Sequence, residues 1–204
     1  MKQRILFLFF LLTTSLCFGQ KEHLKPSEDI SKYRGLPKWC FDKVSKGFSE
    51  KPYAYYACMP HFSGEYAFSI EKKKENYYII SNTLSKNRGS TRVRIFVTVR
   101  KNKLKIDYNL YVKVGELFEL LREQTKEPDN PKPIFGFEAV AYYFATANND
   151  GEVFLGVAWS PDANSLLGRL VDICDKLYLI GSKEDISQTD ILKDIDKLIN
   201  DFKE

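Results

Sequence analysis

The stretch FEAVAYYFATANNDGEVFLGVAW at residues 137–159 decides the fold class of this chain. Two runs rich in aromatic and β-branched residues, 137–147 and 152–159, flank a polar turn at 148–151 that ends in Asp-Gly. An Asp-Gly pair between two such runs is a strong short-range signal of a β-hairpin. The turn lacks the ligand spacing and the terminal glutamate of an EF-hand loop, so we interpret it as a hairpin turn and not as a calcium site.

The part of the chain that precedes this hairpin also predicts antiparallel strands. Tyr66, Phe68 and Ile70 alternate with charged or small residues, which is the period of a strand with one buried face. Four strands are expected, at residues 66–71, 77–80, 93–99 and 104–111, with polar turns at 72–76 and 100–103. Together with the hairpin they make a meander of about six strands.

Apolar stripes at helical spacing predict three helices. Their members are Leu117, Phe118 and Leu121; Leu166, Leu170, Ile173, Cys174 and Leu177; and Ile191, Ile195, Leu198 and Phe202. We expect Pro128 to stop the first helix, Ser160 and Pro161 to begin the second, and Ser187 to cap the third. A short helix is also predicted after Pro37. Because each stripe must bury against an apolar surface, the predicted fold is a single α+β domain, with an antiparallel meander sheet and helices packed mainly on one face.

The first residues have the pattern of a secretory signal peptide. Lys2 and Arg4 precede an apolar run at 5–12, and small residues, Cys17 and Gly19, stand at the −3 and −1 positions of a cleavage site. The apolar run is too short for a membrane anchor, which needs about 20 apolar residues. The sequence predicts a signal peptide at 1–19, a flexible or loosely docked lead-in at 20–36, and one domain at 37–204. The mature protein is expected to be periplasmic or secreted and to have no membrane span, and lipidation of Cys17 stays open as an alternative.

The charge balance excludes a strongly electrostatic partner. The full chain has 31 Lys+Arg and 27 Asp+Glu, and removing Lys2 and Arg4 with the signal peptide leaves 29 basic and 27 acidic residues, a net charge of +2. A nearly neutral protein has no overall field that would attract nucleic acid or an anionic membrane. We therefore predict no nucleic-acid partner. His23 and His61 are the only histidines, which are too few for a multi-histidine metal centre.

Export changes how the cysteines are interpreted. Cys40 and Cys58 are close in sequence, and in an oxidising compartment the simplest arrangement is a disulfide between them. Cys174 lies on a helical apolar stripe and is expected to be a buried thiol. The alternative for Cys58 is a catalytic nucleophile served by His61, although no third residue that would orient this pair is apparent.

The sequence lacks the common signatures of cofactor and metal sites. It contains no phosphate-binding loop, no dinucleotide glycine pattern, no His-Glu-x-x-His and no Cys-x-x-Cys, so no cofactor or metal is predicted. The best candidate for contact with a partner is the proline-rich loop at 128–135, whose three prolines reduce the entropy lost on binding. Its candidate contact residues are Asp129, Asn130, Lys132, Ile134 and Phe135. The alternative is that Ile134 and Phe135 begin the next strand and point into the core.

Three hypotheses about function remain open. The first is an exported, non-catalytic binding protein of the bacterial periplasm or envelope, such as an immunity or inhibitor protein that neutralises a toxin or a hydrolase. The second is a secreted hydrolase that uses carboxylates, for example Glu138 and Glu152 at opposite ends of the hairpin, or Cys58 and His61. The third is an accessory component of an envelope assembly. The missing catalytic constellation favours the first hypothesis, with another protein as the partner.

Overall fold

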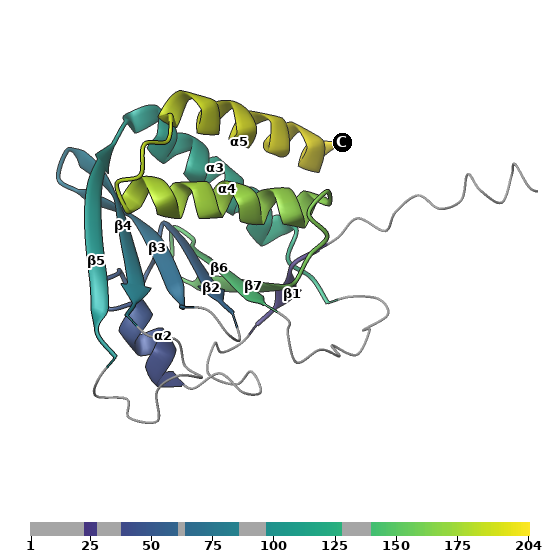
Figure 1. Ribbon diagram of the computed structural model, residues 1–204. Helices are drawn as coiled ribbons and strands as arrows, with labels where there is room; N and C mark the ends of the chain where they lie inside the picture. Colours follow the sequence, from purple (N-terminus) through teal and green to yellow (C-terminus); the bar gives the residue numbers. More distant parts are fainter. Residues whose placement is uncertain (1–22, 28–37, 61–63, 86–96, 128–139) are drawn as a thin grey trace, which may run out of the picture.

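The computed structural model describes residues 23–27, 38–60, 64–85, 97–127 and 140–204, which form a single α+β domain (Figure 1). Within these ranges, an antiparallel sheet of seven strands has four helices packed against it. The strands are β1 (Lys25–Pro26), β2 (Ala54–Met59), β3 (Tyr66–Lys73), β4 (Asn76–Leu84), β5 (Val99–Ile106), β6 (Ala141–Ala147) and β7 (Val153–Trp159). The helices are α2 (Lys38–Val44), α3 (Tyr108–Glu123), α4 (Leu166–Gly181) and α5 (Gln188–Lys203).

The strand order is β1-β7-β6-β2-β3-β4-β5, and every neighbouring pair is antiparallel. Strands β2 to β5 form the predicted meander, and the hairpin β6–β7 adds to the free side of β2. The Asp-Gly turn is confirmed: Gly151 has φ +79°, and Asn148 accepts a hydrogen bond from the backbone N–H of Glu152. The sheet thus places β2 between two strands that are far apart in the sequence.

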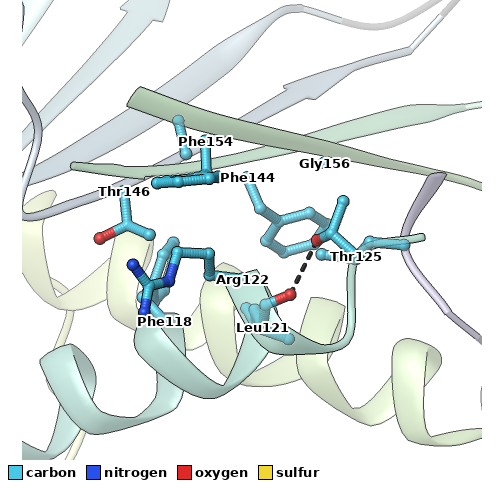
Figure 2. A pocket seen from close by; sticks show the side chains of 10 residues that line it. Phe118, Leu121, Arg122, Thr125, Phe144, Thr146, Phe154 and Gly156 are labelled. Atoms are coloured by element: carbon cyan, nitrogen blue, oxygen red, sulfur yellow. Dashed lines mark hydrogen bonds between the residues drawn. The ribbon is translucent and has the colours of Figure 1, made fainter. Parts of the chain in front are cut away.

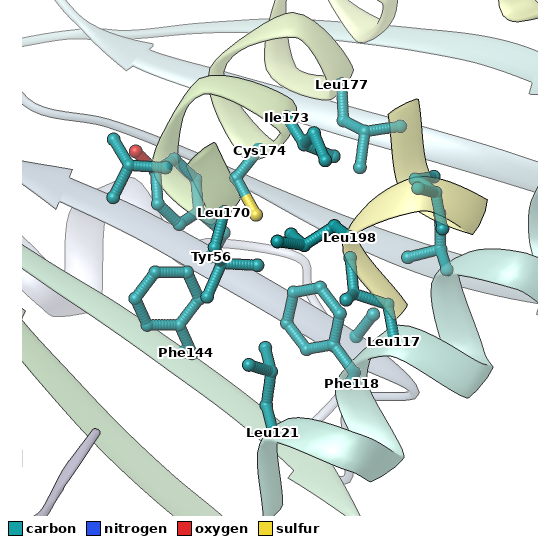
Figure 3. Packing of buried hydrophobic residues seen from close by; sticks show 14 of the residues in the cluster. Tyr56, Leu117, Phe118, Leu121, Phe144, Leu170, Ile173, Cys174, Leu177 and Leu198 are labelled. Carbon is teal, nitrogen blue, oxygen red and sulfur yellow. The ribbon is translucent and has the colours of Figure 1, made fainter. Parts of the chain in front are cut away.

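The predicted fold class is confirmed, with three helices on one face of the sheet. The apolar stripes of α3 and α4 meet the sheet side chains Tyr56 and Phe144 in a common core, and Leu198 of α5 reaches the same core (Figure 3). Helix α5 packs chiefly on α3 and α4, so it lies on the helix layer and not directly on the strands (Figure 1). None of the helices in the described ranges is long and apolar enough to span a membrane.

The short helix α2 covers part of the opposite face. Its side chains Cys40, Phe41 and Val44 are buried, and the ring of Phe41 packs edge-on against Tyr143 with 4.9 Å between the ring centroids. The end of the helix is fixed by Asn82, whose amide nitrogen donates to the carbonyl oxygens of Val44 at 2.7 Å and Lys46 at 3.2 Å. Helix α2 is too short to cover the whole face.

The predicted disulfide between Cys40 and Cys58 is wrong. Both side chains are buried thiols, and they belong to the two different cores on opposite faces of the sheet. Side chains alternate between the two faces of a strand, so Cys58 points toward α4 together with Tyr56, whereas Cys40 packs against the face that carries Tyr55. A disulfide needs Cα atoms within about 7 Å of each other, and the sheet separates these two residues.

The boundary between β5 and α3 also differs from the prediction. Strand β5 runs through residues 100–103, which were expected to form a turn, and it ends at Ile106, where a strand to residue 111 was expected. Leu110 belongs to α3 and continues its apolar stripe, because Leu110, Val114 and Leu117 have helical spacing and are all buried. The helical period therefore prevails over the short alternation. The rest of the predicted strand at 93–99 lies largely outside the described residues.

Two helix boundaries are also corrected. Ser160 does not cap a helix: it directly follows β7 with φ +37°, and its hydroxyl accepts a hydrogen bond from the N–H of Val140. Helix α4 begins five residues later than Pro161, and its cap is Ser165, whose hydroxyl accepts from the N–H of Gly168. The cap predicted at Ser187 is confirmed. Helix α3 ends at Glu123, and the predicted stop at residue 128 lies outside the described residues.

Part of the lead-in at 20–36 is docked on the domain. Leu24 is buried in the core beneath the helices, and β1 pairs with the outer side of β7, where Lys25 is opposite Val157. The backbone N–H of Ser27 extends this pairing by donating to the carbonyl of Leu155 at 2.9 Å. This edge forms one side of the groove described next.

Candidate binding groove

A groove of about 450 Å³ lies on the sheet face that α2 covers only in part. Its lining residues come from β2, β6, β7, the segment between α2 and β2, and the residue after β1; they are Ser27, Ser45, Phe48, Ser49, Glu50, Pro52, Tyr55, Ala145, Val153 and Leu155. The floor follows from strand register: Tyr55 is directly opposite Ala145, and Ala145 is directly opposite Leu155. Three neighbouring strands therefore present one continuous apolar surface.

Phe48 packs beside the floor residue Tyr55 and forms an aromatic wall of the groove. Their rings pack edge-to-face, with 5.9 Å between centroids and an interplanar angle of 71°. The Tyr55 hydroxyl lies 3.0 Å from the Ser45 hydroxyl. Burial raises the pKa of Tyr55 to about 12, and the hydrogen bond with Ser45 opposes this effect. The phenol therefore stays protonated at physiological pH and acts as a neutral hydrogen-bonding group.

The rim of the groove is polar. The N–H of Ser49 donates to a Glu71 carboxylate oxygen at 2.9 Å, which orders the segment between α2 and β2. The Ser27 hydroxyl is buried and has no hydrogen-bond partner among the described residues. Val153, which also lines the groove, is 46% exposed, which is high for a large apolar side chain. The groove thus combines an apolar floor with hydroxyl groups at its edge.

The size and lining of the groove are those of a binding site. Ligand sites in proteins measure about 300–1,000 Å³ and are mainly apolar, with a few polar groups that fix orientation. Among the described lining residues, the ionisable side chains are the protonated phenol of Tyr55 and the exposed carboxylate of Glu50. The groove can hold an apolar group and direct it by hydrogen bonds.

A second pocket, on the opposite face between α3 and the strands β6 and β7, is too small for a ligand (Figure 2). Its volume is about 10 Å³, which is room for about one water molecule. Arg122 lies over the ring of Phe154 at 5.1 Å, and the Thr125 hydroxyl donates to the carbonyl of Leu121 at 2.7 Å. Both polar side chains are therefore engaged within the protein.

A cluster of phenols, a thiol and a carboxylate lies under α4. Tyr56 and Tyr66 donate their hydroxyl hydrogens to the same oxygen of Asp175, at 2.6 and 2.8 Å. Cys58 is directly opposite both Tyr66 and Tyr142 on the neighbouring strands. Burial of Asp175 raises its pKa and outweighs the two phenol hydrogen bonds, which lower it.

This cluster weakens the case for Cys58 as a nucleophile. The side chain is 4% exposed, and burial raises the pKa of its thiol to about 12. A nucleophilic cysteine needs a thiolate, which forms at neutral pH where the pKa is lowered. The suggested base, His61, lies outside the described residues.

The structure describes some of the other residues predicted to be functional and not the rest. The candidate loop at 128–135, with Asp129, Asn130, Lys132, Ile134 and Phe135, lies outside the described residues and stays a prediction. Of the two hairpin carboxylates, Glu138 also lies outside them, and Glu152 bonds to Asn148 within the turn. Among the described residues, no group of three or more histidine, cysteine, aspartate or glutamate side chains is placed to hold a metal ion.

The groove residues were not identified from the sequence. Ala145 and Leu155 sit at alternate positions of the predicted hairpin, so their shared face could have been inferred. Tyr55 could not have been added to them, because its pairing with Ala145 joins residues 90 positions apart. That pairing depends on the insertion of β2 between β3 and β6.

No protein-family model matches this chain, and no curated protein or solved structure matches it either.

Proposed function

We propose that this protein is an exported, non-catalytic binding protein and that the groove on the sheet face recognises a segment of another protein. The observation that carries the proposal is the groove itself, about 450 Å³ with the apolar floor Tyr55, Ala145 and Leu155. Export rests on the signal-peptide pattern at residues 1–19.

The groove suits one or two apolar anchor side chains of a partner. Binding energy at protein interfaces is concentrated in a few aromatic or aliphatic residues that fill well-packed pockets, surrounded by polar contacts that exclude water. Here the strand residues supply a rigid floor, and the exposed residues Ser49 and Glu50 supply polar contacts at the edge. The carboxylate of Glu50 favours a partner with a lysine or arginine beside its anchor.

An immunity or inhibitor role is one form of this proposal. Such a protein neutralises a toxin or a hydrolase by holding it, and it needs a rigid recognition surface but no catalytic groups. The proline-rich loop at 128–135 remains a candidate for a second contact with the same partner, because loops tolerate the sequence changes that partner specificity requires.

A capture experiment with matched variants tests the proposal. The mature chain, residues 20–204, is immobilised as wild type, as Val153→Glu and as Val112→Glu, and bound envelope proteins are identified by mass spectrometry. Val153 is 46% exposed in the groove, and Val112 is 38% exposed on α3, across the sheet, so neither substitution buries a charge. We expect wild type and Val112→Glu to retain the same protein and Val153→Glu to lose it. Equal capture by all three proteins contradicts the proposed site.

A further inference from the structure

Asp175 is a carboxylate without a cation partner among the described residues. Its neighbour Lys176 is engaged elsewhere, in ion pairs with Asp172 at 2.8 Å and Asp194 at 2.9 Å. The charges around Asp175 are therefore unfavourable. Burial is the main cause that raises the pKa of Asp175, and the negative charge of the nearby Asp172 raises it further. A neutral asparagine could accept the same two phenol hydrogen bonds without placing a charge in a half-buried position.

The arrangement leaves one side of the carboxylate open. Both phenols donate to Oδ1, and no described residue donates a hydrogen bond to Oδ2. Asp175, Tyr66 and Tyr142 are all half-buried, so solvent reaches this part of the cluster. Tyr66 and Tyr142 flank Cys58 in one row across β3, β2 and β6, and the ring of Tyr178 packs on Tyr66 with 4.4 Å between centroids.

We propose that Asp175, together with Tyr66 and Tyr142, binds an alkylammonium group. A primary ammonium donates hydrogen bonds to the open carboxylate oxygen, and aromatic rings attract a cation through their electron-rich faces. The group comes either from a lysine side chain of a protein or from a small free amine. This site lies on the helix-covered face, across the sheet from the groove, so it does not depend on the function proposed above.

Burial of the Asp175 carboxylate without an opposite charge disfavours its charged form. Ionisable groups that are held where they cost stability occur preferentially at functional sites. An ammonium ion would supply the missing opposite charge and lower the pKa of Asp175. A metal ion fits less well, because no set of three or more ligating side chains surrounds this carboxylate in the described part of the chain.

Carboxyl-carbon NMR of the full mature chain tests the proposal. The pKa of Asp175 is measured in sodium chloride and in n-butylammonium chloride at equal ionic strength. We expect the pKa to be lower by about one pH unit in saturating butylammonium, the size of effect that a neighbouring opposite charge has. Identical titration curves in the two salts overturn the proposal.

Two further arms identify the source of the ammonium group and check the site. The affinities of Nα-acetyl-lysine N-methylamide and n-butylammonium are compared. Tighter binding of the lysine derivative indicates that the group comes from a lysine side chain, and tighter binding of n-butylammonium indicates a small amine. Either order supports the site. Asp175→Asn should abolish the amine-induced changes in the amide signals of Cys58 and Tyr66, and Asp172→Asn, on the same helix with 62% side-chain exposure, should retain them. Unchanged signals in Asp172→Asn with amine, or retained changes in Asp175→Asn, contradict the assignment.

Discussion

The phenol of Tyr56 and the carboxylate of Asp175 are 119 positions apart in the chain and are joined by a hydrogen bond of 2.6 Å. The bond ties the central strand β2 to helix α4, and Tyr66 adds β3 to the same oxygen. Sheet and helix layer are thus connected at a charged group whose burial opposes its ionisation. This balance has a measurable effect on stability.

The stability of Asp175→Asn relative to wild type should depend on pH. Burial raises the pKa of Asp175 in the folded chain, so its contribution to stability is present below the unfolded pKa of about 3.9 and is lost as pH rises through the folded value. The asparagine variant keeps a neutral group at every pH. Its free energy of unfolding in urea, relative to wild type, should therefore be more favourable at about pH 7 than at about pH 4. The same relative value at both pH values would show that burial of the charge costs nothing.

Leu170→Asp should unfold the protein. Leu170 is fully buried in the core between the sheet and α4, so the substitution removes its packing and places an unpaired charge there. Loss of the packing alone costs about 2–5 kcal/mol, and the buried charge adds to this. Leu179→Asp on the same helix is the control, because Leu179 is 38% exposed and should tolerate the change. Equal melting temperatures for the two variants would show that this stripe is not core.

The cysteines of the mature chain should behave as buried thiols. Iodoacetamide should label Cys40, Cys58 and Cys174 slowly in the native protein and completely after unfolding, because all three are buried. A reducing agent should leave the melting temperature unchanged. Recovery of a linked Cys40–Cys58 peptide from a non-reducing digest would refute the placement of these residues on opposite faces.

The disulfide between Cys40 and Cys58 was predicted wrongly because the prediction relied on their nearness in sequence. Nearness in sequence says nothing about which face of a sheet a side chain occupies, and α2 crosses to the face opposite Cys58. Hydrophobic periodicity, in comparison, is local. It identified the buried stripes that contain Leu117, Leu170 and Ile195, because a helix must bury its apolar side regardless of topology.

Strand order and the groove depend on non-local pairing. The hairpin β6–β7 was recognisable from its turn, but nothing in its residues indicates that β6 pairs with β2. The polar run Arg100–Lys103 was also misleading. It has the composition of a turn, but it belongs to the outermost strand of the described sheet. Exposed lysines are common on such strands because they discourage edge-to-edge association.

Asn82→Ala should loosen α2 and the groove wall together. Asn82 is fully buried and donates to two carbonyls at the end of α2. Its loss leaves the Val44 carbonyl without this donor, whereas the Lys46 carbonyl keeps a hydrogen bond from the Lys101 side chain. We expect a loss of about 1–3 kcal/mol in the free energy of unfolding. Asn200→Ala, at an exposed position of α5, is the matched control and should have little effect. If both variants are equally stable, Asn82 does not hold the helix.

The most direct test of the groove is site-specific photo-crosslinking. A benzophenone amino acid is placed at Val153 in the groove or at Val112 on α3, and each protein is irradiated in envelope extract. Both positions are exposed, and they lie on opposite sides of the sheet. We predict one discrete cross-linked protein from position 153, which excess unlabelled wild-type chain suppresses, and none from position 112. A product from position 112 alone, or the same product from both positions, would contradict the account of the groove as the recognition site.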